Sequence, residues 1–219
     1  YQTVMNLGTG LGITALAVQV YSRFCESPRP SDILQKMYLL PGFIAASISF
    51  VGLTKILHPR VYDASVYMID SAFLASPSFH IAESVSAMPI LRATLVLIYM
   101  HLPTAAALVF VVSKWKKTEN ESGVLGAFLW VGFAGFALYH IIPVVGPTYF
   151  FRSGFPSNPP DPEKMKAIRY LAIPEYRNCF PSLHTAWALV VIAYARPLGR
   201  IMFALASVFL GLTLLATIG

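Results

Sequence analysis

The residues with the clearest chemical potential form one short segment, Phe180-Pro181-Ser182-Leu183-His184, at the start of an apolar run. Pro181 suits the first turn of a helix, where its missing N–H costs no hydrogen bond. The unpaired N–H groups of such a turn attract anions. Ser182 adds a hydroxyl donor, and His184 adds an imidazole that can donate a proton near neutral pH. Together these groups predict a site for a phosphoryl group.

The polar segment before this motif supplies positive charge. Residues 148–178 form the longest polar stretch of the chain. Arg177 precedes His184 by seven residues and is the first candidate to share a bound phosphate with it. Lys166 and Arg169 are further candidates, and the sequence does not rank one above the other. The alternative interpretation is that His184 is an interfacial histidine and that Pro181 merely begins a helix.

The motif resembles the Pro-Ser-x-His element of the type-2 phosphatidic acid phosphatase superfamily. Its leading Phe180 and central Leu183 are similar to the branch that contains inositol phosphorylceramide synthase. Two weaker features agree with that branch, namely a Pro-x-x-Gly-Pro pattern within residues 139–149 and a polar, helix-spaced stretch that begins at Asp63. The resemblance covers roughly residues 60–219.

The resemblance implies a reaction without metal or other cofactor that passes through a phosphohistidine. The histidine that matches His184 would protonate the leaving group, a form of help typically worth 10²–10⁴-fold. The phosphate would be held by basic side chains and helix-start N–H groups. The nucleophilic histidine and its aspartate belong to a His-x-x-x-Asp element that follows the next span, so we expect them beyond Gly219, in a segment that this chain lacks.

The implied substrate is a membrane phospholipid or lipid phosphate. Hydrolysis and transfer differ only in whether water or an alcohol such as inositol accepts the phosphoryl group, and the motif subtype favours transfer. The alternative is a non-catalytic membrane subunit that binds anions or lipids, or serves assembly, and retains the phosphate pocket. A third hypothesis, a transporter, predicts intramembrane charges or internal repeats, of which the spans show essentially neither.

Four other residues are candidates for the pocket or for a headgroup site: Asp63, Asp70, His140 and Tyr149. The two aspartates could receive a polar headgroup, or they could cap a helix or pair with a nearby arginine. His140 could face the pocket or pack as an interfacial histidine. Tyr149 also begins an aromatic cluster typical of a membrane interface.

The composition predicts an integral membrane protein. Of the 219 residues, 56% are hydrophobic and only 12% are charged, whereas a soluble domain carries about 25% charged residues. A run of about 20 apolar residues crosses a bilayer. The sequence therefore predicts one all-α membrane domain over residues 1–219, a helical bundle like that of the resembling superfamily. We expect about six transmembrane helices, at residues 4–21, 37–57, 91–112, 124–145, 180–195 and 201–219.

Residues 58–90 are too polar to span. Asp63, Tyr67 and Asp70 fall on one face at helical spacing, which predicts an amphipathic helix that lies in the membrane interface.

The net charge of +6 indicates contact with anionic lipids or an anionic substrate. No basic face with interleaved aromatic residues points to nucleic acid. Lys and Arg counts in the loops do not decide the orientation; if the basic residues of segment 148–178 bind phosphate, that loop faces the extracytoplasmic or lumenal side. The two cysteines, Cys25 and Cys179, lack metal-type spacing, and the sequence carries no signal for an oligomeric state.

Overall fold

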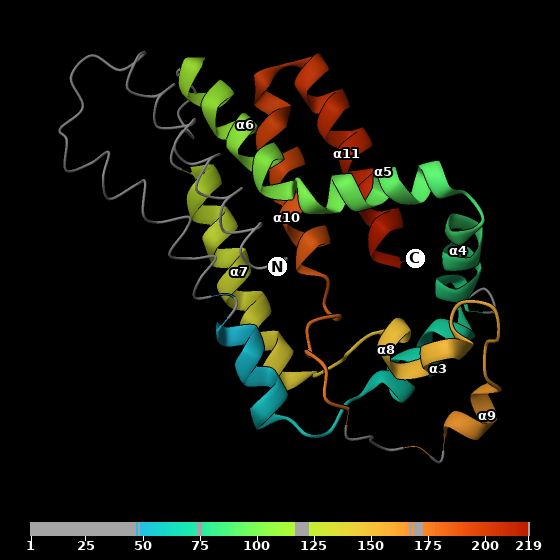
Figure 1. Cartoon of the computed structure of the whole chain (residues 1–219). Helices are drawn as coiled ribbons and strands as arrows, with labels where there is room; N and C mark the ends of the chain where they lie inside the picture. Colours follow the sequence, from blue (N-terminus) through green and yellow to red (C-terminus); the bar gives the residue numbers. More distant parts are fainter. Residues whose placement is uncertain are drawn as a thin grey trace.

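The computed structural model describes residues 47, 49–73, 76–116, 123–166, 168 and 173–218 (Figure 1). All the regular secondary structure in this described part is helical. Residues 49–57 are helical and are followed by α3 (Asp63–Ala72), α4 (Pro77–Ser86), α5 (Pro89–Met100), α6 (Leu102–Trp115), α7 (Gly123–Ile141), α8 (Pro147–Phe151), η1 (Arg152–Gly154), α9 (Pro162–Met165), α10 (Leu183–Ala195), η2 (Arg196–Leu198) and α11 (Arg200–Ile218).

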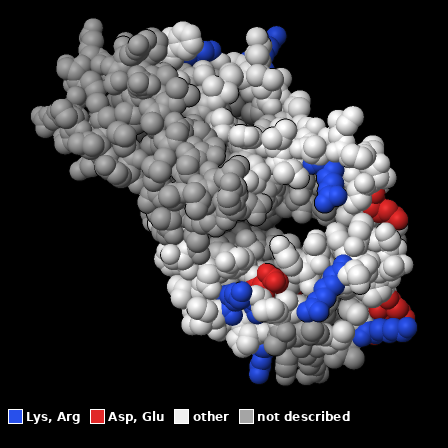
Figure 2. Space-filling model, in the orientation of Figure 1, with Lys and Arg blue, Asp and Glu red and all other residues white. Residues whose placement is uncertain are grey.

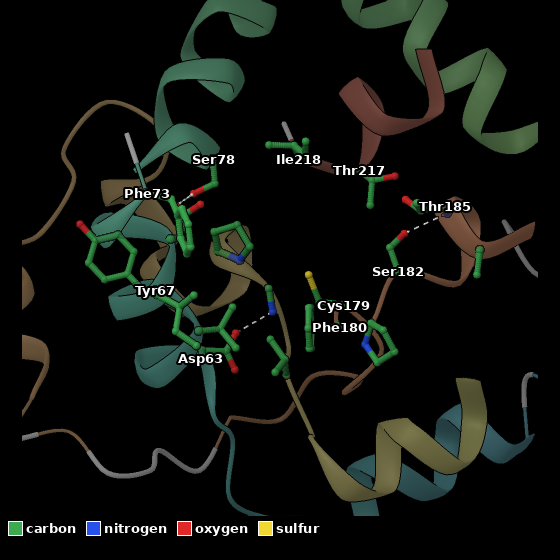
Figure 3. A pocket seen from close by; sticks show the side chains of 18 of the residues that line it. Asp63, Tyr67, Phe73, Ser78, Cys179, Phe180, Ser182, Thr185, Thr217 and Ile218 are labelled. Atoms are coloured by element: carbon green, nitrogen blue, oxygen red, sulfur yellow. Dashed lines mark hydrogen bonds between the residues drawn. The ribbon is translucent and has the colours of Figure 1, made fainter. Parts of the chain in front are cut away.

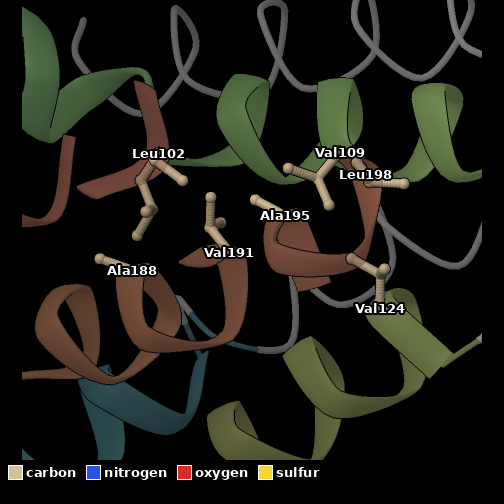
Figure 4. Close-up of a cluster of buried hydrophobic side chains, with 8 residues drawn as sticks. Leu102, Val109, Val124, Ala188, Val191, Ala195 and Leu198 are labelled. Atoms are coloured by element: carbon tan, nitrogen blue, oxygen red, sulfur yellow. The ribbon is translucent and has the colours of Figure 1, made fainter. Parts of the chain in front are cut away.

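Helix α10 lies at the centre of this arrangement and packs against α6, α7 and α11. Its residues Ala188, Val191 and Ala195 are almost completely buried. They meet Leu102 and Val109 of α6 in the largest buried apolar cluster (Figure 4). Small residues on α10 allow the neighbouring helices to come close. The helix that carries the Ser-x-His motif is therefore held by the core of the protein.

The predicted span at residues 91–112 is not one helix. Helix α5 ends at Met100, and α6 begins at Leu102 on a different axis (Figure 1). Pro103 explains the break, because a proline inside a helix removes a hydrogen bond and its ring clashes with the carbonyl four residues earlier. The prediction of a single straight span here was wrong.

The predicted interfacial helix over residues 58–90 also divides into two helices, α3 and α4. Ser76, between them, has a left-handed backbone with φ 68°. It precedes Pro77, and a residue before proline avoids the α-helical region. The predicted shared face of Asp63, Tyr67 and Asp70 is confirmed, because all three line the same cavity.

One helix of the described part, α11, is by itself long and apolar enough to cross a membrane. Helices α4 and α5 pass the same test only as a pair bent by 113°. Shorter apolar helices cover Leu102–Ser113, Gly126–Ile141 and Leu183–Leu198. The predicted span at residues 4–21 and most of the one at 37–57 lie outside the described residues, so the expected number of six stays a prediction.

Candidate active site

A cavity of about 600 Å³ lies between α3 and the first turns of α10 (Figure 3). Four residues of α10 and its N-cap line it at helical spacing: Ser182, Thr185, Ala186 and Leu189. The end of α11 and the turn before α8 complete the wall. In the space-filling view the surface is hollowed between α5 and α3, and Lys or Arg side chains flank the hollow (Figure 2). Most of the lining is apolar, as is usual for sites that hold small ligands.

Ser182 is the N-cap of α10, and its hydroxyl oxygen accepts a hydrogen bond from the backbone N–H of Thr185 at 3.2 Å. Serine is among the preferred residues at this position, because its oxygen pairs an N–H group that the helix leaves open. Pro181 therefore precedes the cap rather than occupying the first helical turn, which corrects its predicted place. Ser182 lies on the cavity wall, as the motif predicted for a phosphate-binding hydroxyl.

His184 follows Ser182 two residues later, in the first turn of α10. Its imidazole stacks on the ring of Tyr99 in α5, with centroids 3.5 Å apart and planes inclined by 16°. The edge of Trp187 approaches it at a centroid distance of 6.0 Å. The side chain is half-buried and is not part of the cavity wall. The structure thus places Ser182 on the cavity and His184 beside Tyr99.

Arg177 is almost completely buried, with 2% of its surface exposed. Its Nε donates to the backbone carbonyl of His58 at 3.0 Å, and one Nη donates to the carbonyl of Glu175. Burial lowers the pKa of this guanidinium, and the charge of Asp63 opposes that effect. Arg177 holds backbone groups together and does not line the cavity.

Lys166, the second basic candidate, does not line the cavity. Lys166 is exposed, and its Nζ pairs with Glu163 at 2.5 Å. Arg169 lies outside the described residues. Among the described residues, the cavity wall contains no Lys or Arg.

Asp63 lines the cavity but is only 5% exposed. Its two carboxylate oxygens accept hydrogen bonds from the backbone N–H groups of Val145 at 3.0 Å and Gly146 at 2.7 Å. Burial raises the pKa of this carboxyl, whereas the two N–H donors and the charge of Arg177 act in the opposite direction. Two N–H donors match an ionised carboxylate, which is an acceptor only.

Asp70 lies farther along the same face of α3. Its Oδ2 accepts a hydrogen bond from the hydroxyl of Ser78 at 2.6 Å, which joins α3 to α4. Between the two aspartates, the hydroxyl of Tyr67 donates to the carbonyl of Pro160 at 2.6 Å. The ring of Tyr67 packs edge-on against Phe79 and Phe151. These contacts hold the α3 wall of the cavity in place.

His140 and Tyr149 lie away from the cavity wall. His140 Nδ1 is 2.9 Å from His58 Nε2, so the two rings share one hydrogen bond. The pKa of His58 is lowered by burial, and further by the positive charges of His140 and Arg177. Tyr149 is 53% exposed.

Four polar lining residues were not predicted as site residues by the sequence analysis: Ser78, Cys179, Thr185 and Thr217. Helical spacing from Ser182 could have found Thr185, because the two residues are three positions apart. Thr217 comes to the cavity from the end of α11 through tertiary packing, and nothing local in the sequence marks it. Within the described ranges, no three His, Cys, Asp or Glu side chains gather closely enough to hold a metal ion.

The described part of the chain is all-helical and holds a largely apolar cavity at a Pro-Ser-x-His helix start. Sequence comparison shows the class of protein, because the family model of the PAP2 superfamily matches residues 64–219. The chain therefore belongs to the PAP2 superfamily, whose members are phosphatases and phosphotransferases and generally membrane proteins. No curated protein and no solved structure matched the chain.

Proposed function

We propose that this protein is a membrane lipid phosphotransferase or phosphatase that acts on a phospholipid or a lipid phosphate. One observation carries the proposal: the family match includes a Ser-capped helix start that opens onto a largely apolar cavity. The helix start suits the phosphoryl group, and the apolar wall suits the hydrocarbon part of a lipid. We also propose that the protein belongs to the branch that contains inositol phosphorylceramide synthase, because Phe180 and Leu183 of its motif resemble that branch.

In the proposed mechanism, Ser182 and the first N–H groups of α10 hold the phosphate oxygens. His184 protonates the leaving oxygen as general acid. From its stacked position on Tyr99, the imidazole reaches that oxygen only if its side chain turns toward Ser182 or if the ester binds on the Tyr99 side. The phosphohistidine step also needs a nucleophilic histidine and an aspartate that orients it.

Positive charge for the phosphate comes from the basic segment before α10 in this proposal. Lys166 and Arg169 are the candidates whose side chains could reach a bound anion. Arg177 contributes through its charge, because its nitrogens already donate to backbone carbonyls. Such positioning and electrostatic stabilisation are what phosphoryl transfer mainly requires.

The cavity offers room for an alcohol acceptor such as inositol. Asp70 and Thr185 present polar atoms to it from opposite walls, and hydroxyl groups of an acceptor would find hydrogen-bond partners there. Transfer to such an alcohol, rather than hydrolysis, is the reaction that the motif subtype favours.

The site faces the extracytoplasmic or lumenal side of a multi-pass protein in this proposal. The α10–α11 turn, with Arg196 and Arg200, lies at the opposite end of the molecule from α8 and α9 (Figure 1). Lys116 lies at the same end as this turn, because its Nζ donates to the carbonyl of Leu198 at 2.5 Å. Basic residues favour the cytoplasmic side of a membrane, and this orientation follows if the basic residues of segment 148–178 are set aside as phosphate ligands.

The test uses the native full-length protein in detergent with a panel of lipid phosphoesters, each with and without added inositol. The wild type is compared with His184→Ala and with His80→Ala, an exposed histidine on α4. We expect His184→Ala to fold normally but to release phosphate, or transfer the headgroup, about 10²-fold or more slowly than wild type. His80→Ala should have the wild-type rate. Unchanged turnover in His184→Ala contradicts the acid role. If the wild type is inactive on all the lipids of the panel, the result favours the alternative, a non-catalytic subunit for binding or assembly.

A further inference from the structure

Three segments of the chain meet beside the cavity: the start of α3, the turn between α7 and α8, and the residues that lead into α10. Two backbone hydrogen bonds join them through the middle segment. The N–H of Tyr62 donates to the carbonyl of Pro143 at 2.9 Å, and the N–H of Cys179 donates to the carbonyl of Val144 at 3.0 Å. The turn therefore lies between the other two segments and is bonded to both.

Asp63 makes two more hydrogen bonds at the junction of these three segments, in addition to the two backbone bonds. It binds the N–H of Val145 with one carboxylate oxygen and that of Gly146 with the other, and Figure 3 draws one of these two bonds. Hydrogen bonds to an ionised acceptor are shorter and about twice as strong as neutral ones. Because both oxygens are engaged and the side chain is 5% exposed, Asp63 has little surface left with which to receive a headgroup.

The backbone conformation of the Val145–Gly146 turn requires glycine at position 146. Gly146 has φ +97°, a left-handed conformation that residues with a side chain rarely adopt. A Cβ at this position would also lie 2.8 Å from the sulfur of Cys179. The turn and the segment before α10 are thus in direct contact at the point where Asp63 binds the turn.

Arg177 anchors the same segment from the other side. Its backbone N–H donates to Thr54 Oγ1 at 3.2 Å, and its Nε donates to the carbonyl of His58. Its positive charge lies near Asp63 and favours the ionised carboxylate. Only four residues lie between Arg177 and Ser182, so the position of this anchored segment limits where the helix start can lie.

We propose that Asp63 is a positioning residue of the active site. By binding the Val145–Gly146 turn, it fixes the Cys179 segment and therefore the place of Ser182 and His184 relative to the cavity. This inference rests on the proposed function for its effect on turnover, although the junction itself does not. It gives Asp63 a different role from direct contact with the substrate headgroup.

Asp63→Asn tests the role with little change of shape. Asparagine keeps one carbonyl oxygen but turns an NH₂ donor toward a backbone N–H, so one bond to the turn is lost. Asp161→Asn is the matched control, because Asp161 is exposed and its Oδ1 bond to the N–H of Glu163 survives in asparagine. Gly146→Ala disturbs the same turn from within and serves as a second variant if Asp63→Asn does not fold.

Two readouts are taken on the full-length protein: steady-state kinetics and hydrogen–deuterium exchange. We expect Asp63→Asn to lower kcat about tenfold or more, since small misplacements of catalytic groups are costly. The decrease should be equal with water and with inositol as acceptor, while KM for the lipid stays within about twofold. Amide exchange should become faster both in residues 143–147 and in residues 177–182. Gly146→Ala should show the same pattern, and the double variant should fall short of the product of the two effects.

Three results overturn the inference. The first is that Asp63→Asn changes only the KM for one acceptor or headgroup and leaves amide exchange unchanged. That result would indicate direct contact between Asp63 and the substrate. The second is wild-type kinetics in Asp63→Asn. The third is faster exchange in the turn alone, with residues 177–182 as protected as in wild type. If the wild type itself is inactive on every phosphoester, the proposed function fails, and the exchange data alone then support or overturn the junction.

Discussion

The imidazole of His184 lies flat on the phenol ring of Tyr99, with the two centroids 3.5 Å apart. The pair joins the first turn of α10 to α5, two elements separated by more than 80 residues in the chain. The stack covers one face of the imidazole, and His184 is not among the residues that line the cavity. In the proposed mechanism, release of this stack would bring His184 to a substrate bound in the cavity.

Tyr99→Leu should make His184 more reactive toward diethylpyrocarbonate, because one face of the imidazole loses its cover. Tyr99→Phe is the control, since it retains the ring and should keep the wild-type rate. The rate of modification at His184 is measured by peptide mass spectrometry in detergent. Equal rates in all three proteins would show that the stack does not restrict this side chain.

Gly135→Ala should destabilise the protein, because a Cβ at Gly135 would overlap the side chain of Leu183. Leu183 is the first residue of α10 and is 5% exposed. Overpacking of this kind costs typically 1–3 kcal/mol. Gly126→Ala, on the same helix, meets nothing within 4 Å and should be neutral or stabilising by up to about 1 kcal/mol. Thermal unfolding of both variants in one detergent decides the matter; equal midpoints would contradict the close packing of α7 on α10.

Ser182→Ala should lower stability by about 1 kcal/mol, because the N–H of Thr185 loses its capping partner. Ser182→Thr should retain most of that stability, since threonine also caps helices. Ser207→Ala is a matched control, because Ser207 is a partly exposed residue inside α11 whose hydroxyl donates to the carbonyl of Phe203. If thermal unfolding finds Ser182→Ala no less stable than Ser207→Ala, the cap is not a stabilising feature.

Stability should fall as the pH decreases through about 6.5, the ordinary pKa of histidine. The pKa of His58 is lowered in the folded protein by burial, by His140 and by Arg177. Below that pH the unfolded chain binds the proton more readily than the folded chain, so protonation favours unfolding. Above it, the stabilising effect is fully present.

His58→Gln should flatten this dependence, because glutamine does not titrate. The measurement is the midpoint of thermal unfolding at several pH values between about 5.5 and 7.5, with His80→Gln as a variant of an exposed histidine. An unchanged slope in His58→Gln would show that the pH dependence has another origin.

Local patterns in the sequence were sufficient for much of the fold and for the family. Long apolar runs indicated helices close to those observed at α7, α10 and α11. The Ser-x-His motif at a helix start led to the superfamily, and the family match confirmed it. The shared face of Asp63, Tyr67 and Asp70 followed from helical spacing alone. These features depend on residues within a few turns of one another, which is why the sequence shows them directly.

Tertiary structure decided how the candidate residues are used. Arg177 was predicted to share a phosphate with His184, and Asp63 either to receive a headgroup or to cap a helix or pair with an arginine. In the structure both side chains are buried and bind backbone groups of distant segments. His184 and Ser182 are two residues apart, yet Ser182 lines the cavity whereas His184 stacks on Tyr99 of α5. A sequence specifies which groups are present and their local spacing, whereas hydrogen-bond partners 80 or more residues away exist only once the core has brought the segments together.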